Sequence, residues 1–449
     1  MIQQETIVAL STASGVGAIA VIRLSGIDSF DIVNKVFRGK DLKIQKSHTA
    51  HFGLIVENEA IIDEVVVTIF KGPQSFTKED VVEISCHGSP YIVNKIIRLL
   101  IKNGARSANA GEFTQRAFLN GRFDLTQAEA VADLIASENE LSHQLAVKQL
   151  RGGFAKEIQN LRTELIDFAS LIELELDFSE EDVEFANRDH LKTNIYKILH
   201  VISPLIQSFE WGNTVKNGVP VVIVGRPNAG KSTLLNTLLN EERAIVSDIA
   251  GTTRDTIEEY FVINGLKFRL IDTAGLRDTV DTIESIGIKK AYEKINEADI
   301  VIYLYDSTQM TAKELKSDLE ALTIKDQKLL VIGNKADKLT DKSKLEHTQL
   351  LLSAQVASDV EVLKNELFKI ASSQKGSSDN VITNSRHYES LLKTQEALEQ
   401  VLNGMELGIT SDFIAMDIRL ALHHLGLITG EVTTDDLLGN IFGKFCIGK

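Results

Sequence analysis

A glycine-rich loop that ends in Lys and Ser is the feature whose chemistry is clearest. Residues 225–232 have the sequence GRPNAGKS, directly after the apolar run 219–224 and before a leucine-rich helical pattern. Glycines let backbone N–H groups close around phosphate oxygens, and a helix start adds partial positive charge. Lys231 would reach the outer phosphates and Ser232 would ligate Mg²⁺. We predict a nucleotide site made by Asn228, Ala229, Gly230, Lys231, Ser232 and Thr233.

A second motif predicts the base. Residues 334–337 are NKAD and follow an apolar strand pattern. A carboxylate at Asp337 can accept both the N1–H and the 2-amino group of guanine. Adenine has no such donor pair, so a buried Asp337 would be left unpaired against ATP. Asn334 is expected to support the loop and the base edge, and the Lys335 stem to cover the ring.

Three more segments complete the pattern of a guanine-nucleotide site. Ser353 and Ala354 follow the apolar run 350–352, which would place the Ala354 N–H near the guanine O6. The segment DTAG at 272–275 follows a strand pattern, and GTTRD at 251–255 precedes it. The residues of these two segments that we predict to contact Mg²⁺ or the nucleotide phosphates are Thr252, Thr253, Asp272, Thr273, Ala274 and Gly275. Together these motifs indicate a GTPase of the translation-factor-related class.

The residue after Gly275 departs from a common pattern. Many related GTPases have Gln there to orient the attacking water, whereas this chain has Leu276, which has no polar side-chain atom. Water must be oriented by another group, or hydrolysis needs assistance. Glu284 in the next segment is a candidate, although spacing alone favours a solvated helix residue.

The apolar patterns change along the chain and suggest a discontinuous organisation. Residues 1–120 mix β-branched runs with glycine loops, which predicts an α+β domain. Residues 121–216 are helical in pattern, and an α/β P-loop GTPase domain is expected at 217–379. Helical spacing returns from His387 to Ile428, within a segment 380–449 that ends in a short polar tail. We therefore predict a multidomain fold in which the α/β domain is inserted into a helical domain.

Composition limits the function classes. The 449 residues carry a net charge of -15, with 48 Lys and Arg against 63 Asp and Glu. This charge weighs against tight sequence-independent binding to nucleic acid, but not against a substrate held by a local patch or by a partner. Two cysteines exclude a disulfide scaffold, and the apolar runs are too short to span a bilayer. We expect a cytoplasmic protein without a membrane partner.

The whole chain resembles one family, the tRNA modification GTPases MnmE (TrmE). The resemblance rests on GRPNAGKS, DIAGTTRD and DTAGLR, on GEFTQRAFLNGRFDLTQAEA at 111–130, and on FCIGK at 445–449. It implies a homodimer formed through the first domain. It also implies an FAD-containing partner of the MnmG (GidA) type, with a heterotetramer expected. Such enzymes use GTP and a tetrahydrofolate one-carbon donor to install an aminomethyl or carboxymethylaminomethyl group on C5 of the wobble uridine of certain tRNAs.

The resemblance also assigns residues around the nucleotide. It implies a K⁺ ion beside the phosphates, and it gives Glu284 the role of orienting water. A cation there can stand in for an arginine finger by neutralising transition-state charge. By sequence alone, Asn228 could instead be a loop-stabilising residue, which is the less favoured alternative. The K⁺ ligands implied by the family are Asn228, Ser247, Ile249 and Thr252.

For folate, the family's contacts fall on Arg23, Glu83, a basic residue at position 122 and Lys449. Arg23 and Lys449 would hold the anionic tail, and Glu83 would accept from pterin N–H groups. Lys is familiar at position 122, but this chain has Arg122, which keeps the charge and changes the head-group geometry. Cys446 is a candidate catalytic thiol beside folate, or a small apolar residue that anchors the tail.

A competing hypothesis is a regulatory or ribosome-assembly GTPase, a switch without modification chemistry. The P-loop domain alone permits it. The first domain and the FCIGK end argue against it, because a pure switch has no need of them.

Overall fold

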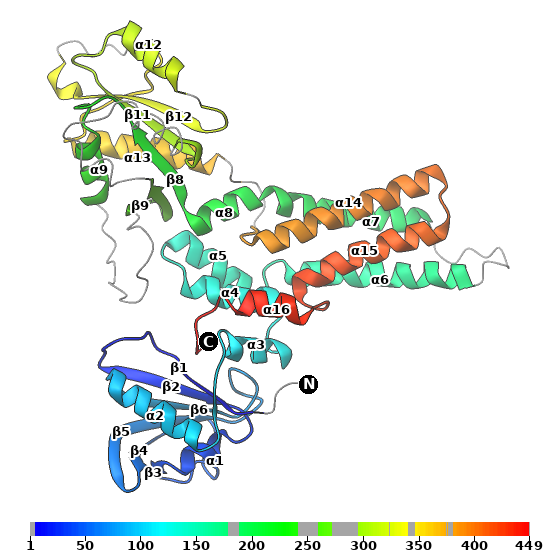
Figure 1. Ribbon diagram of the computed structural model, residues 1–449. Helices are drawn as coiled ribbons and strands as arrows, with labels where there is room; N and C mark the ends of the chain where they lie inside the picture. The colour runs from blue at the N-terminus through cyan, green and yellow to red at the C-terminus, as the bar shows by residue number, and fades with distance from the viewer. Residues whose placement is uncertain are drawn as a thin grey trace.

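The computed structural model describes residues 5–177, 188–240, 259–271, 295–322, 324–339, 346–373, 375 and 380–448. Figure 1 shows a sheet domain from the N-terminal residues, an elongated set of helices, and a second sheet domain attached through α8. Within the described residues, no helix combines the length and apolar character needed to cross a membrane.

The first sheet has the strand order β3-β4-β5-β6-β2-β1-β7, and all neighbours are antiparallel except β1 and β7. Helices α1 and α2 bury their apolar sides against one face. The bounds are β1 Ile7–Leu10, β2 Ile19–Ser25, α1 Ser29–Asn34, β3 Phe37–Arg38, β4 Thr49–Glu57, β5 Ala60–Phe70, β6 Val81–His87, α2 Pro90–Lys102, β7 Arg106–Ser107 and α3 Glu112–Leu119.

The helical region is made of two stretches that are far apart in sequence. Helices α6, α7, α14 and α15 pack side by side around one apolar core, and α4, α5, α8 and α16 lie near the two sheet domains (Figure 1). The bounds are α4 Leu125–Ile135, α5 Glu140–Leu150, α6 Ala155–Asp177, α7 Arg188–Gln207, α8 Phe209–Asn217, α14 Ser385–Leu407, α15 Ser411–Thr429 and α16 Asp435–Phe442.

The helical pattern predicted from His387 to Ile428 forms two helices, because Gly408 has φ +67° and ends α14 before α15 begins. One detail of this region differs from the sequence prediction. The segment after Ile428, predicted to be a polar tail, contains α16. Thr434 caps that helix, and its Leu438 and Phe442 are buried.

The second sheet domain has the strand order β13-β12-β11-β8-β10-β9, parallel except for β9 and β10. A parallel sheet of this kind gathers the carboxyl ends of its strands at one edge, where ligands bind. The bounds are β8 Val219–Val224, α9 Lys231–Asn240, β9 Glu259–Ile263, β10 Leu266–Leu270, β11 Ile300–Asp306, α12 Ala312–Ala321, β12 Lys328–Asn334, η2 Ala336–Lys338, β13 Leu350–Leu351 and α13 Ala357–Ser372.

A buried ionic cluster joins the two helical stretches. Glu129 on α4 accepts hydrogen bonds from Arg386 on α14, at 2.9 and 2.8 Å, and lies 2.7 Å from the His387 Nε2. Arg386 also donates to the backbone carbonyls of Leu427 and Ile428. Burial alone would raise the pKa of Glu129, but His387 and Arg386 outweigh it and lower the pKa to about 2.

Glu129→Ala is expected to destabilise the protein by about 3–5 kcal/mol, because Arg386 and His387 would remain buried without their counter-charge. Glu129 has an ordinary pKa of 4.5 and a lowered one in the folded state. Its stabilisation is therefore fully present above pH 4.5 and is lost as the pH falls from about 4.5 towards 2. Urea denaturation followed by helical circular dichroism measures both effects.

The matched control is Glu173→Ala, which removes an exposed partner of Arg419 and should cost less than about 1 kcal/mol. Equal denaturation midpoints for the two variants would contradict the role given to the buried cluster.

Candidate functional site

The predicted phosphate loop lies between β8 and α9, at the carboxyl end of the parallel sheet. Gly225 has φ +148°, and a Cβ atom there would lie 1.9 Å from the Leu304 carbonyl oxygen. Gly230 has φ +97°, and its Cβ would lie 2.2 Å from the Asn334 Nδ2. Asn228 adopts φ +63°, a conformation that Asn tolerates better than most residues. The loop shape therefore depends on these three residue types.

The Lys231 side chain is held over this loop by backbone carbonyl groups of the loop itself. Its Nζ donates to the carbonyl oxygens of Gly225 and Arg226, at 2.9 and 3.0 Å. Burial lowers the pKa of the ammonium group. A phosphate is a charged acceptor and binds an ammonium more strongly than a carbonyl does. The position of Lys231 over the loop is compatible with the predicted contact with the outer phosphates, which stays a prediction.

Asn334 connects the phosphate loop to the predicted base-binding loop. Its side chain is 3% exposed. The Nδ2 donates to the Ala229 carbonyl at 2.8 Å, and the Oδ1 accepts from the Ala354 N–H at 2.9 Å. Thr237 on α9 donates to the Ala354 carbonyl at 2.8 Å. The Ala354 N–H is therefore already used by Asn334, and a contact with the guanine O6 would require it to be shared.

The predicted base-binding residues lie at the end of β12. Lys335 has φ +63°, and its Nζ donates to Asp306 at 2.6 Å, which fixes the direction of its stem. Asp337 lies in the short helix η2 and is exposed. The predicted guanine specificity requires that Asp337 be shielded from water when the base is bound. A guanine base would have to cover the carboxylate itself.

Sequence reasoning missed a charged clamp that holds the loop against α12. Arg226 forms ion pairs with Glu314 at 3.0 Å and with Asp318 at 2.7 Å, and Tyr303 donates to the same Asp318. These carboxylates raise the pKa of Arg226. Position 226 is variable in the motif, and its partners lie about ninety residues later, so local spacing contains no signal for the clamp.

Several predicted residues lie outside the described part of the chain. For the nucleotide site these are Ser247, Ile249, Thr252, Thr253, Asp272, Thr273, Ala274, Gly275 and Glu284. For the folate site it is Lys449. Ser232 and Thr233 are described, and both are exposed in the first turn of α9. A hydroxyl oxygen in this position is of the type that Mg²⁺ prefers, so Ser232 fits the predicted metal contact.

The structure brings together three of the residues predicted to contact folate. Arg23 and Glu83 face each other on neighbouring strands and form an ion pair of 2.7 Å. The Arg23 guanidinium lies 5.3 Å from the Phe76 ring centroid, and the Arg122 guanidinium lies 4.9 Å from the same centroid. Burial and the charge of Arg23 lower the pKa of Arg122. Phe76, Glu83 and Arg122 line a cavity of about 570 Å³.

The C-terminal segment is attached to this first domain. The Cys446 carbonyl accepts from the Gly111 N–H at 3.3 Å, Ile447 pairs with Ala110, and the Gly448 carbonyl accepts from Ser11 at 3.2 Å. The Cys446 side chain is exposed, whereas Phe442 and Phe445 pack together at the end of α16. The aromatic residues and the backbone therefore anchor this segment, and the Cys446 thiol does not.

Two family models match the chain. Residues 125–446 match the model described as the MnmE helical domain, and residues 6–122 match that of the GTP-binding protein TrmE N-terminus. The tRNA modification GTPase MnmE of Cytophaga hutchinsonii is 56% identical over 450 residues, which cover 99% of this chain and 98% of that protein. This chain belongs to the MnmE family of tRNA modification GTPases.

A second curated relative agrees with this assignment. The tRNA modification GTPase MnmE of Flavobacterium johnsoniae is 56% identical over 466 residues and all of both chains. The solved G domain of the T. maritima FeoB iron transporter is 26% identical over 34% of this chain and 98% of that chain, with a TM-score of 0.26, too low for any conclusion. Family membership confirms the multidomain fold class and makes the chain a GTPase, with GTP as its substrate and Mg²⁺ as its expected metal.

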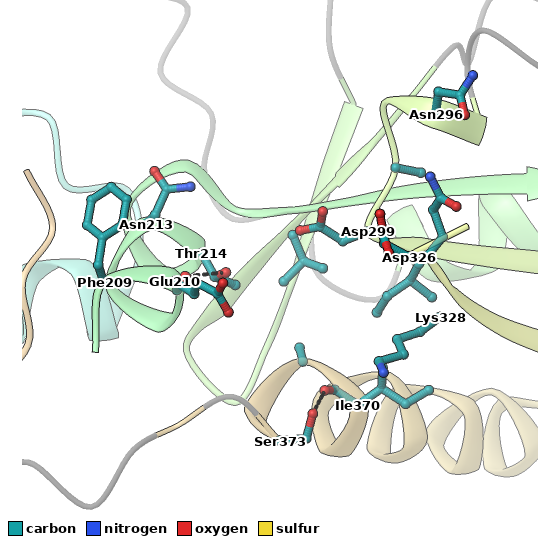
Figure 2. A pocket seen from close by; sticks show the side chains of 15 residues that line it. Phe209, Glu210, Asn213, Thr214, Asn296, Asp299, Asp326, Lys328, Ile370 and Ser373 are labelled. Atoms are coloured by element: carbon teal, nitrogen blue, oxygen red, sulfur yellow. Dashed lines mark hydrogen bonds between the residues drawn. The ribbon is translucent and has the colours of Figure 1, made fainter. Parts of the chain in front are cut away.

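A second cavity, of about 450 Å³, lies at the other end of the parallel sheet. Figure 2 shows Glu210 and Asn213 of α8, Asp299 before β11 and Lys328 of β12 around it. Burial raises the pKa of Asp299, and Glu210 adds to the effect, although Arg269 opposes it. Because nucleotides bind at the carboxyl ends of such strands, this cavity belongs to the junction with the helical region, not to the nucleotide site.

Asn334→Ala is expected to lower GDP affinity about 5- to 100-fold. It would leave the Ala229 carbonyl and the Ala354 N–H without their partner, at a cost of about 1–3 kcal/mol. Asn236→Ala, an exposed change on α9, is the matched control and should bind normally. Titration with a fluorescent GDP analogue measures both, and unchanged affinity in Asn334→Ala would refute the bridging role.

Proposed function

We propose that this chain works with an MnmG-type FAD protein to install an aminomethyl or carboxymethylaminomethyl group on C5 of the wobble uridine of certain tRNAs. The one-carbon unit comes from a tetrahydrofolate derivative, and GTP hydrolysis drives the cycle. The observation that carries the proposal is the combination of an intact phosphate loop with a separate cavity beside Arg23, Glu83 and Arg122. A regulatory switch alone would have no use for the cavity in the first domain.

The residues around the cavity in the first domain suit a folate. Its volume lies within the usual range for small-molecule sites. Aromatic rings at Phe70 and Phe76 offer flat apolar contact, and Arg122 offers a cation to a carboxylate. Arg23 and Glu83 form an ion pair. A ligand that binds either side chain must therefore replace this ion pair with contacts of its own. Cys446, attached nearby through the Gly111 N–H, would supply a thiol at the edge of this region.

In the nucleotide domain, Lys231 holds the outer phosphates and Ser232 faces the metal. Glu284 would orient the attacking water, since Leu276 cannot. When bound, K⁺ would add positive charge beside the phosphates as transition-state charge develops. Asn228 has an exposed side chain at the head of the loop, and its amide oxygen fits such a ligand. Asp337 would supply guanine specificity.

A homodimer through the first domain is part of the proposal. Helices α1 and α2 cover one face of the first sheet, and apolar side chains remain exposed elsewhere on it. Phe52 and Val66 are register partners on β4 and β5, 67% and 41% exposed, and Ile19 on β2 is 67% exposed. Apolar side chains grouped on a sheet favour burial against another surface. A second copy of this domain would provide it, and two flavoprotein chains would complete a heterotetramer.

The segments 1–120, 121–216, 217–379 and 380–449 are proposed as the functional units of this cycle. We propose a cytoplasmic location, as expected from the sequence, because the proposed substrate is a tRNA.

Potassium is expected to accelerate GTP hydrolysis, and Asn228 to carry much of that response. Turnover should be at least several-fold faster in KCl than in NaCl at equal ionic strength. Asn228→Gly removes the amide while accepting the φ of +63°, so it should bind GTP normally and lose the difference between the salts. Equal wild-type rates in both salts would contradict the K⁺ site.

The function itself is tested by nucleoside analysis of tRNA from cells that lack this protein. Wobble uridines should lose their C5 substituent, and the wild-type gene should restore it. Glu284→Ala should bind GTP nearly normally, hydrolyse it slower by orders of magnitude, and fail to restore the modification. Unchanged wobble uridines in the deletion strain would remove the proposed function. Normal modification by a slowly hydrolysing variant would show that hydrolysis is not coupled to the chemistry.

A further inference from the structure

The first domain is the least acidic part of the molecule. Residues 1–120 contain 13 Lys and Arg against 12 Asp and Glu, whereas the remaining residues contain 35 against 51. No Asp or Glu occurs between Glu83 and Glu112, a stretch that includes the whole of α2. A polyanion approaching this acidic protein is therefore repelled least near α2.

Helix α2 presents a row of cations to solvent. Lys95, Arg98 and Lys102 are spaced i, i+3 and i+7, so they lie on one side of the helix, and the opposite side is buried against the sheet. Seven residues of helix span about 10 Å. That length matches about three nucleotides of a stacked strand, at about 3.4 Å each. Lys35 extends the row, since its Nζ donates to the Asn103 carbonyl just after α2.

The charges of this row are little neutralised by the protein. Glu57 is the acidic residue that lines the same shallow cavity, and it lies 3.6 Å from Lys102. Within the described residues, Arg98 has neither an ion pair nor a side-chain hydrogen bond. Surface cations that lack acidic partners keep their charge for an external ligand.

An exposed aromatic ring begins the same row. Tyr91 is 72% exposed in the first turn of α2, and the Lys95 Nζ lies 6.0 Å from its ring centroid. The ring and the cations border a cavity of about 560 Å³. An aromatic ring beside cations can bind a single-stranded nucleotide, because the base stacks on the ring and the phosphates contact the cations. An acidic peptide or a free phosphate would make use of the charges and not of the ring.

We propose that α2 is an RNA-docking surface, on which Lys95, Arg98 and Lys102 bind backbone phosphates and Tyr91 stacks on one unpaired base. The proposal rests on the proposed function, which supplies a tRNA as the RNA. Helix α2 packs on the sheet face that carries Ile22 and Leu24, whereas the intervening Arg23 points to the other face. The surface therefore holds the body of the tRNA and not the reacting base.

The test measures binding of an unmodified tRNA transcript to the full-length protein by fluorescence anisotropy at several salt concentrations. Arg98→Ala/Lys102→Ala should weaken binding about 10- to 60-fold at 0.1 M salt and lower the salt slope by about 1.4–1.8. Lys313→Ala/Lys316→Ala removes the same charge from exposed positions on α12 and should change affinity less than about twofold.

Tyr91 gives an independent readout. Tyr91→Ala should weaken binding about 5- to 100-fold without changing the salt slope, and Tyr91→Phe should bind as wild type does, because a base stacks on either ring. Equal losses in the two double variants, or no binding by the wild-type protein, would overturn the proposal. Displacement by polyglutamate as effective as by RNA would also overturn it, in favour of an acidic protein partner.

GTP hydrolysis in the absence of RNA should be unchanged in all these variants, which separates loss of docking from loss of the nucleotide site. If wobble uridines kept their modification in cells that lack this protein while RNA affinity still depended on α2, the docking surface would stand and the proposed function would fall.

Discussion

The carboxylate of Glu129 is the contact on which the arrangement of the whole chain depends. Its partners lie 257 positions later in the sequence, beyond the entire nucleotide domain. The chain connection before α14 therefore leads into a helix that this cluster holds in place, whereas the connection after α8 leaves a helix that packs against α5 and α7. A buried carboxylate that contacts Arg386 and His387 tolerates little displacement, because losing these contacts leaves its charge without solvent or counter-ion. A conformational change in the nucleotide domain would therefore reach the rest of the chain as a rigid-body movement of these helices.

Local chemistry in the nucleotide domain could be predicted from the sequence, whereas its long-range ties could not. The strand predicted at 219–224 is β8, and the helix predicted after Lys231 is α9, because a phosphate loop needs that local order. The exposure of Asp337 and the sharing of the Ala354 N–H were not predictable. The second depends on Asn334, whose hydrogen-bond partners lie 105 and 20 positions away. Motif spacing contains no information on such contacts.

The first domain shows the same division. The β-branched runs noted in residues 1–120 form strands that include β2, β5 and β6, and the register of β2 with β6 places Arg23 opposite Glu83. Family resemblance named both residues as separate folate contacts, but it could not show that they neutralise each other. That pairing depends on the alignment of two strands sixty positions apart. A ligand at this site must therefore compete with an internal bond, which makes charge complementarity as important as shape.

The attachment of residues 446–448 to the first domain affects how the protein is made. The Ser11 hydroxyl and the Gly448 carbonyl that it contacts are 437 positions apart, and a side chain at Gly448 would collide with the Leu10 carbonyl. A ribosome adds about 5–20 residues per second, and domains fold as they emerge. The first domain must wait tens of seconds, while the helices and the nucleotide domain are synthesised, before this segment can reach it. A chain released early would carry a complete nucleotide domain and a first domain that lacks the contacts made by residues 446–448.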